Sequence, residues 1–148
     1  MIILIDGPSG SGKTTLARTL GAALGWPVVH LDDFYPGWSG LAAARDMVPS
    51  VITERRYQRW DWEHNVAGSW VAVSRGDLII EGVGAISAAS ISADDEVLSI
   101  LMTAPEDVRK ARALARDEGY APYWEHWSAQ EREHFASMPA AQLVLRGG

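Results

Sequence analysis

The sequence contains no cysteine among its 148 residues. This absence excludes disulfide bonds, thiolate catalysis and cysteine zinc sites, and it fits a protein of the reducing cytoplasm. No run of eighteen apolar residues is present, so the sequence predicts no membrane span. The first ten residues, MIILIDGPSG, lack the basic start and the long apolar run of a secretory signal. We therefore expect a cytoplasmic location.

Lysine is also scarce, and the chain has no basic tract. Eleven of the thirteen basic residues are arginine, and the net charge is −6. This acidic balance argues against nucleic acid as the main partner. The two lysines are Lys13 and Lys110. A chain that otherwise uses arginine keeps lysine at position 13, so the surroundings of Lys13 are informative.

Lys13 lies in the segment GPSGSGKTT, which matches G-x-x-x-x-G-K-[ST], the pattern of the phosphate-binding P-loop. The apolar run IILID before it predicts a buried strand, and Leu16, Leu20 and Leu24 follow at helical spacing. In this arrangement, backbone N–H groups and a helix N-terminus bind phosphate. We expect Lys13 to reach the β- and γ-phosphates and the Thr14 hydroxyl to bind Mg²⁺. The predicted phosphate-binding residues are Gly7, Ser9, Gly10, Ser11, Gly12, Lys13, Thr14 and Thr15. The alternative is an ordinary Gly/Ser turn before a helix.

Strand and helix patterns alternate along the chain, and its length predicts one domain over residues 1–148. Apolar runs predict five strands, at Ile2–Ile5, Val28–Leu31, Leu78–Ile80, Val97–Met102 and Leu143–Leu145. Further helices are predicted at Leu41–Val48, Pro105–Asp117 and Tyr123–Ser137. This alternation favours an α/β fold in which helices cover both faces of a parallel sheet.

Three carboxylates follow predicted strands. Asp32 and Asp33 end the second strand, and Glu81 ends the third. Because ligands of such sheets bind at the carboxyl ends of the strands, all three acids should lie at the same edge as the P-loop. An acid near Thr14 can hold Mg²⁺ directly or through water, so we predict a metal site formed by Thr14, Asp33 and Glu81. The alternatives are a solvated acid at Glu81 and a helix-cap or turn role for the aspartates.

The segments GPSGSGKTTLA, LDDFYP and LIIEGV together resemble the uridine kinase-like branch of P-loop kinases, which includes phosphoribulokinase and pantothenate kinase relatives. The resemblance implies a P-loop NTPase fold of three α/β/α layers, with five parallel strands in the order 2-3-1-4-5. It also implies that Asp32 is the catalytic base and that Phe34 and Tyr35 are the aromatic pair of the family's signature. Asp32 would accept the proton of a substrate hydroxyl as that oxygen attacks the γ-phosphate of ATP. Asp33, at the variable position, would instead hold a Mg²⁺-bound water or orient the loop.

A predicted helix supplies cations for the transferring phosphoryl group. Arg109, Arg112 and Arg116 are three and four residues apart and share one face of this helix. In the kinases that the chain resembles, such a helix leads into a lid, and here the lid would cover residues 109–125. Arg112 and Arg116 match its catalytic arginines best. The alternative is a solvated basic face paired with neighbouring acids.

The segment Glu54–Asn65 is the densest mixture of aromatic residues, arginine and acids in the chain. Flat aromatic side chains can stack on a base, and an acid can bind ribose hydroxyls. We predict that Asp32, Tyr35, Trp60 and Asp61 contact the acceptor, and Asp61 resembles the substrate-holding aspartate of uridine kinases. The alternative is a structural tryptophan cluster. We interpret Trp124 and Trp127 as packing residues and the four histidines as structural or exposed.

The sequence leaves three functional hypotheses open. The first is an ATP- and Mg²⁺-dependent kinase of a nucleoside, and the second is a kinase of another small hydroxylated acceptor such as a sugar or vitamin precursor. The third is a nucleotide-binding or ATPase module without an acceptor. The acids after the second strand and the arginines of the lid favour phosphoryl transfer over hydrolysis. A GTPase is disfavoured because neither lysine lies in an Asn-Lys-x-Asp motif.

Overall fold

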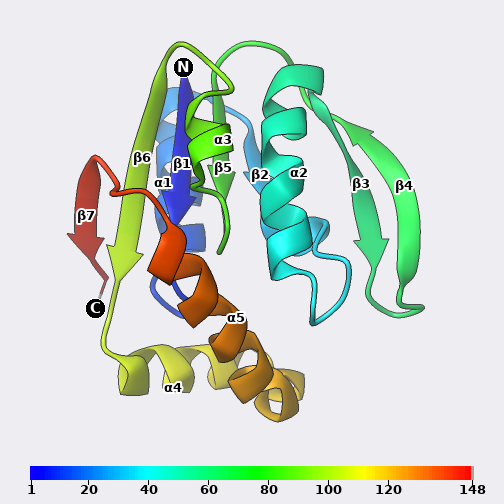
Figure 1. Cartoon of the computed structure of the whole chain (residues 1–148), viewed down its shortest axis with the longest axis vertical. Coiled ribbons are helices and arrows are strands. Elements are labelled where there is room, and N and C mark those ends of the chain that lie inside the picture. Colours follow the sequence, from blue (N-terminus) through cyan, green and yellow to red (C-terminus); the bar gives the residue numbers. More distant parts are fainter. Residues whose placement is uncertain (148) are drawn as a thin grey trace.

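Five parallel strands form the main sheet of the computed structural model, which describes residues 1–147 (Figure 1). They are β1 (Ile2–Asp6), β2 (Val28–His30), β5 (Leu78–Glu81), β6 (Val97–Thr103) and β7 (Leu143–Arg146). Their order is β2-β5-β1-β6-β7. Counted among the five predicted strands, this order is 2-3-1-4-5, so the predicted fold class and strand order are confirmed.

The central strand, β1, is buried along its whole length because neighbours pair with both of its edges and helices cover both faces. Its sequence is accordingly apolar on both faces until Asp6. All five strands point the same way, so the carboxyl ends of β1, β2 and β5 meet at one edge of the sheet. The P-loop, the segment after β2 and Glu81 therefore lie close together.

Helices cover the sheet on both sides. Helix α1 (Lys13–Leu24) packs on one face, behind the sheet in Figure 1. Helices α2 (Leu41–Glu54), α3 (Ala88–Ile91) and α5 (Trp124–Ser137) lie on the other face. Helix α4 (Glu106–Arg116) and the 3₁₀ segment η2 (Glu118–Tyr123) connect β6 to α5 beyond the edge that carries the P-loop. Within residues 1–147, no helix is both long and apolar enough to cross a bilayer.

The predicted helices agree with these bounds to within a residue, except for α2. This helix continues past its predicted end at Val48 and through Pro49 to Glu54. Proline at this position removes one backbone hydrogen bond, but Val51 and Ile52 in the following turn are buried against the sheet. The range predicted as a lid, residues 109–125, covers most of α4, all of η2 and the start of α5.

A β-hairpin outside the main sheet was not predicted. It consists of β3 (Arg56–Asp61) and β4 (Val66–Ala72), which pair antiparallel beside α2 (Figure 1). The register shifts between Gln58 and Trp60, and neither strand alternates regularly between buried and exposed residues. The period of two that identifies a strand in a sequence is therefore missing here.

Candidate active site

The P-loop forms a concave turn between β1 and α1. Gly7 and Gly10 have φ values of 147° and 78°, which side chains rarely tolerate. A Cβ atom at Gly7 would also collide with the Met102 carbonyl, and one at Gly10 with the backbone of Arg109. The N–H groups of the first turn of α1 have no acceptor within the helix and are free to bind an anion. The local geometry is thus that of a phosphate cradle.

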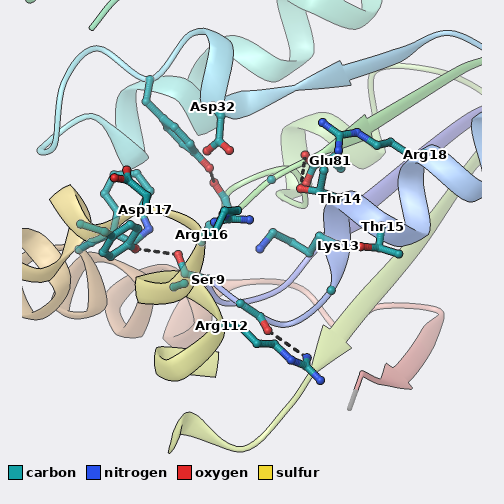
Figure 2. Close-up of a pocket in the computed structure, with 18 of the residues that line it drawn as sticks. Ser9, Lys13, Thr14, Thr15, Arg18, Asp32, Glu81, Arg112, Arg116 and Asp117 are labelled. Carbon is teal, nitrogen blue, oxygen red and sulfur yellow. Dashed lines mark hydrogen bonds between the residues drawn. The ribbon is translucent and has the colours of Figure 1, made fainter. Parts of the chain in front are cut away.

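Two side chains of this loop fit an anionic ligand. The Lys13 ammonium donates a hydrogen bond to the Pro8 carbonyl, at 3.1 Å, and lines a cavity of about 700 Å³ (Figure 2). The Ser11 hydroxyl is buried, and no other described residue hydrogen-bonds to it. A buried polar atom without a partner is costly unless a ligand or water satisfies it. These features suit the phosphates of a nucleotide.

Glu81 joins the P-loop side of the cavity to β2. Its Oε1 accepts a hydrogen bond from the Thr14 hydroxyl at 3.0 Å and lies 2.6 Å from His30 Nδ1. Burial disfavours the charged carboxylate, but the hydrogen bond from His30 and the charge of Lys13 outweigh burial and lower the pKa of Glu81. The same hydrogen bond raises the pKa of His30. An ionised carboxylate beside a threonine hydroxyl is a donor set that suits Mg²⁺.

Asp32 lies in η1 (Leu31–Asp33), the single 3₁₀ turn that follows β2. Its side chain points into the cavity (Figure 2), where its surface stays open to solvent although protein atoms are packed around this part of the chain. This desolvation and the charge of Glu81 raise the pKa of Asp32, although Lys13 and Arg116 oppose the shift. A carboxylate with a raised pKa is a stronger base than one with the ordinary pKa, which suits proton abstraction.

Two of the three arginines predicted on α4 reach the cavity. Arg112 and Arg116 line it, and Arg112 also donates a hydrogen bond to the Gly10 carbonyl at 3.3 Å (Figure 2). Arg109 does not line the cavity and instead bonds to the carbonyls of Ala104 and Ser9. The cavity thus contains the cations that a polyphosphate would require.

Aromatic side chains form the end of the cavity around Asp32, and one of them, Tyr120, also reaches the P-loop through the Ser9 hydroxyl. The aromatic residues that line it are Tyr35, Trp38, Trp62, Tyr120 and Trp127. Tyr35 donates a hydrogen bond to the Val83 carbonyl at 2.7 Å. The indole N–H of Trp62 donates to the Asp32 backbone carbonyl at 3.0 Å, which places one aromatic ring beside the candidate base. This end can accept a molecule with an apolar face.

Outside the P-loop, three predicted site residues do not line the cavity. Asp33, Trp60 and Asp61 do not line it, so the metal role expected for Asp33 and the acceptor roles expected for the other two are not supported by this geometry. Asp61 ends β3 and accepts hydrogen bonds from the backbone and ring of His64, which lower its pKa. Trp60 faces a smaller pocket between α2 and the hairpin.

Other residues reach the site without having been predicted there. Trp38, Trp62 and Arg18 line the cavity, and His30 contacts Glu81. Trp127 is buried, as predicted for a packing residue, yet it also lines the cavity. The usable signal was the position of Trp38 and Trp62 between the second and third predicted strands. Trp60 and Asp61 lie in the same interval of the sequence. Without knowledge of the hairpin, the sequence could not show that Trp38 and Trp62 line the cavity while Trp60 and Asp61 do not.

Comparisons with known proteins agree with this geometry. The model of a family described as "AAA domain" matches residues 3–132. A cytidylate kinase from Haloarcula marismortui is 32% identical over 119 residues, which cover 79% of this chain and 59% of the relative. The chain therefore aligns with less than two thirds of that protein.

Solved structures share the fold. A candidate fructose transport system kinase from Silicibacter sp. TM1040 superposes with a TM-score of 0.67 at 21% identity, over 97% of this chain and 88% of that one. A protein described as a possible uridine kinase from Bacillus stearothermophilus gives a TM-score of 0.53 at 22% identity, over 98% and 88%. The matches thus include several kinds of kinase and do not single out the uridine kinase-like branch. The chain belongs to the AAA domain family, and the relatives described here are named as kinases.

Proposed function

We propose that this chain is an ATP-dependent kinase that transfers the γ-phosphate to a hydroxyl group of a small uncharged molecule, most simply a nucleoside. One observation carries the proposal: a single cavity contains a phosphate cradle at one end and a carboxylate among aromatic rings at the other. Phosphoryl transfer needs these two ends in contact, because the attacking oxygen and the γ-phosphate must meet.

At the nucleotide end, the P-loop N–H groups and Lys13 hold the phosphates, while Arg112 and Arg116 neutralise charge on the transferring group. Thr14 and Glu81 would hold Mg²⁺, which would withdraw charge from the phosphate oxygens when bound. We also propose that the protein is cytoplasmic and that residues 1–148 form a single domain. Residues 109–125 would act as a lid over the nucleotide. The lid role is supported by the contacts that α4 and η2 make with the P-loop.

At the acceptor end, Asp32 accepts the proton of the substrate hydroxyl. The hydroxyl oxygen forms the new bond to the γ-phosphorus, the bond to the bridging oxygen breaks, and ADP leaves. The position of Asp32 in the cavity and its raised pKa support this role. Asp33 is outside the cavity, which favours Asp32 over Asp33 as the base.

The cytidylate kinase relative suggests a phosphate acceptor as a second candidate. Such an acceptor brings a dianion that must be bound by cations. The residues that line the aromatic end are Asp32, Tyr35, Trp38, Trp62, Asp117, Tyr120 and Trp127, and the charges of Lys13 and Arg116 act on Asp32. Two carboxylates in this set disfavour a monophosphate and suit an uncharged polyhydroxyl compound.

The proposal is tested by ADP release from Mg·ATP with uridine, cytidine, gluconate, cytidine monophosphate or no acceptor. We expect a nucleoside to stimulate release and Asp32→Asn to abolish the stimulation, with the phosphorylated product identified by mass spectrometry. Stimulation by the monophosphate with formation of a diphosphate would assign the phosphate acceptor instead. Release that no acceptor changes would favour an ATPase or nucleotide-binding module.

A further inference from the structure

The N–H, hydroxyl and carbonyl groups of Ser9 in the P-loop all form hydrogen bonds with residues that follow β6. Its N–H donates to Glu131 Oε2 on α5 at 2.8 Å, and its hydroxyl lies 2.8 Å from the Tyr120 hydroxyl in η2. Its carbonyl accepts a hydrogen bond from Arg109 on α4 at 3.3 Å. Three successive elements of the chain thus hold one residue of the phosphate cradle.

Glu131 is an unusual residue for this position. Its side chain is buried, with 4% exposed, and within residues 1–147 it forms no ion pair with lysine, arginine or histidine. A buried carboxylate is unfavourable unless it is hydrogen-bonded, and its negative charge opposes phosphate binding nearby. The contribution it can make to the cradle is therefore the hydrogen bond to the Ser9 N–H.

This bond occupies an N–H group that lies before the first turn of α1. The Ser9 N–H is directed to α5, whereas the free N–H groups at the start of α1 remain available. One turn further along α5, His134 Nε2 lies 2.9 Å from Asp6 Oδ2, and Asp6 also accepts the N–H of Gly7 at 2.7 Å. The same face of α5 therefore contacts the P-loop directly at Ser9 and, through Asp6 at the end of β1, the N–H of Gly7.

We propose that Glu131 and Tyr120 are positioning residues that hold the P-loop in its phosphate-binding conformation through Ser9. The glycines on either side of Ser9 give the loop conformational freedom that nucleotide binding would otherwise have to restrict. Affinity falls by the fraction of molecules whose loop is not in the competent conformation. The inference rests on the proposed function only for the statement that the P-loop binds a nucleotide. It does not depend on the identity of the acceptor.

The first test is calorimetric titration of Mg·ADP into wild type, Glu131→Gln, Glu131→Leu and Glu133→Leu. Glutamine keeps an oxygen that can accept the Ser9 N–H, leucine does not, and Glu133 is an exposed position on the same helix. We expect Glu131→Leu to weaken binding about tenfold, Glu131→Gln to restore most of it and Glu133→Leu to match wild type. Equal binding by all four proteins would overturn the inference, as would equal losses in the glutamine and leucine variants.

The second test removes, one at a time and together, the two hydroxyl groups of the Ser9–Tyr120 hydrogen bond. It does not depend on whether Glu131→Leu folds. Tyr120→Phe and Ser9→Ala each delete one hydroxyl of the 2.8 Å contact. If they act through this bond, each weakens Mg·ADP binding several-fold and the double variant is no weaker than the single ones. The inference for Tyr120 would be contradicted if the loss of affinity in the double variant equalled the product of the two single losses. It would also be contradicted if no variant lost affinity. Failure of wild type to bind Mg·ADP would instead overturn the proposed function together with this inference.

Discussion

Thr14 and Glu81 are joined by a hydrogen bond of 3.0 Å that connects the first turn of α1 to the end of β5. The two side chains come from positions 67 residues apart, and both line the cavity. Parallel pairing of β1 with β5 brings them together, because Ile5 and Glu81 are partners in the register of the sheet.

This contact predicts a Mg²⁺-dependent defect. Thr14→Ala removes the hydroxyl and Glu81→Gln removes the charge that the metal would use, so both should weaken ADP binding in the presence of Mg²⁺. In EDTA, both variants should bind ADP within about twofold of wild type, since the P-loop N–H groups and Lys13 remain. Calorimetry with and without Mg²⁺ measures the difference, and an equal loss in both conditions would rule out a metal role.

The raised pKa of Asp32 predicts opposite effects of Asp32→Asn on activity and stability. Activity should fall about 100-fold or more, because the variant lacks the base. The folded-state pKa lies above the ordinary value of 3.8, so the charged carboxylate destabilises the fold as pH rises through the folded pKa. The variant should therefore have a slightly higher melting temperature at pH 7; the effect is small because Asp32 is exposed and solvent screens its charge. The advantage should disappear at about pH 3, where the carboxyl is protonated in both states. A lower melting temperature of the variant at pH 7 would contradict the cause given for the shift.

Two neighbouring residues of the hairpin should differ in their effect on the acceptor. Trp62 lines the cavity, whereas Asp61 bonds to His64 at the turn. Trp62→Ala should raise the KM for the acceptor about tenfold, as loss of a stacking aromatic side chain does. Asp61→Asn keeps an oxygen for the turn and should leave the KM unchanged. Steady-state kinetics compare the two, and the reverse result would return Asp61 to the role predicted from the sequence.

The buried contact between Asp6 and His134 should matter for stability. Both side chains are at most 2% exposed, and His134→Leu would leave the carboxylate with backbone donors alone. Removing one partner of such a pair costs about 3 kcal/mol of unfolding free energy. Urea unfolding measures this cost, and Arg132→Leu, at an exposed position of α5, is the matched control that should stay within about 0.5 kcal/mol of wild type. Equal stability of the two variants would contradict the expectation.

The sequence predicted the main sheet because buried parallel strands are apolar on both faces and can be recognised one at a time. The P-loop was predictable for a related reason: its pattern is local, and the residues from Gly7 to Thr14 are adjacent in the chain. Glu81 and Asp32 followed from the rule that strand ends meet at one edge of the sheet.

The acceptor end could not be predicted in the same way. Which of Trp60, Asp61 and Trp62 points into the cavity depends on an antiparallel pairing with a register shift, and a shift of one residue moves every side chain to the other face. The anchoring of Ser9 was also out of reach, since its partner Glu131 is 122 residues away and looks like any helix-surface acid in the sequence.

The hairpin of β3 and β4 pairs with no strand of the main sheet among residues 1–147. It contributes Trp62 to the acceptor end of the cavity and no side chain to the nucleotide end. Under the proposed function, the share of the acceptor end that the hairpin supplies can therefore change during evolution separately from phosphate binding. The hairpin can diverge, or be exchanged between relatives, while the elements that recognise the nucleotide remain unaltered.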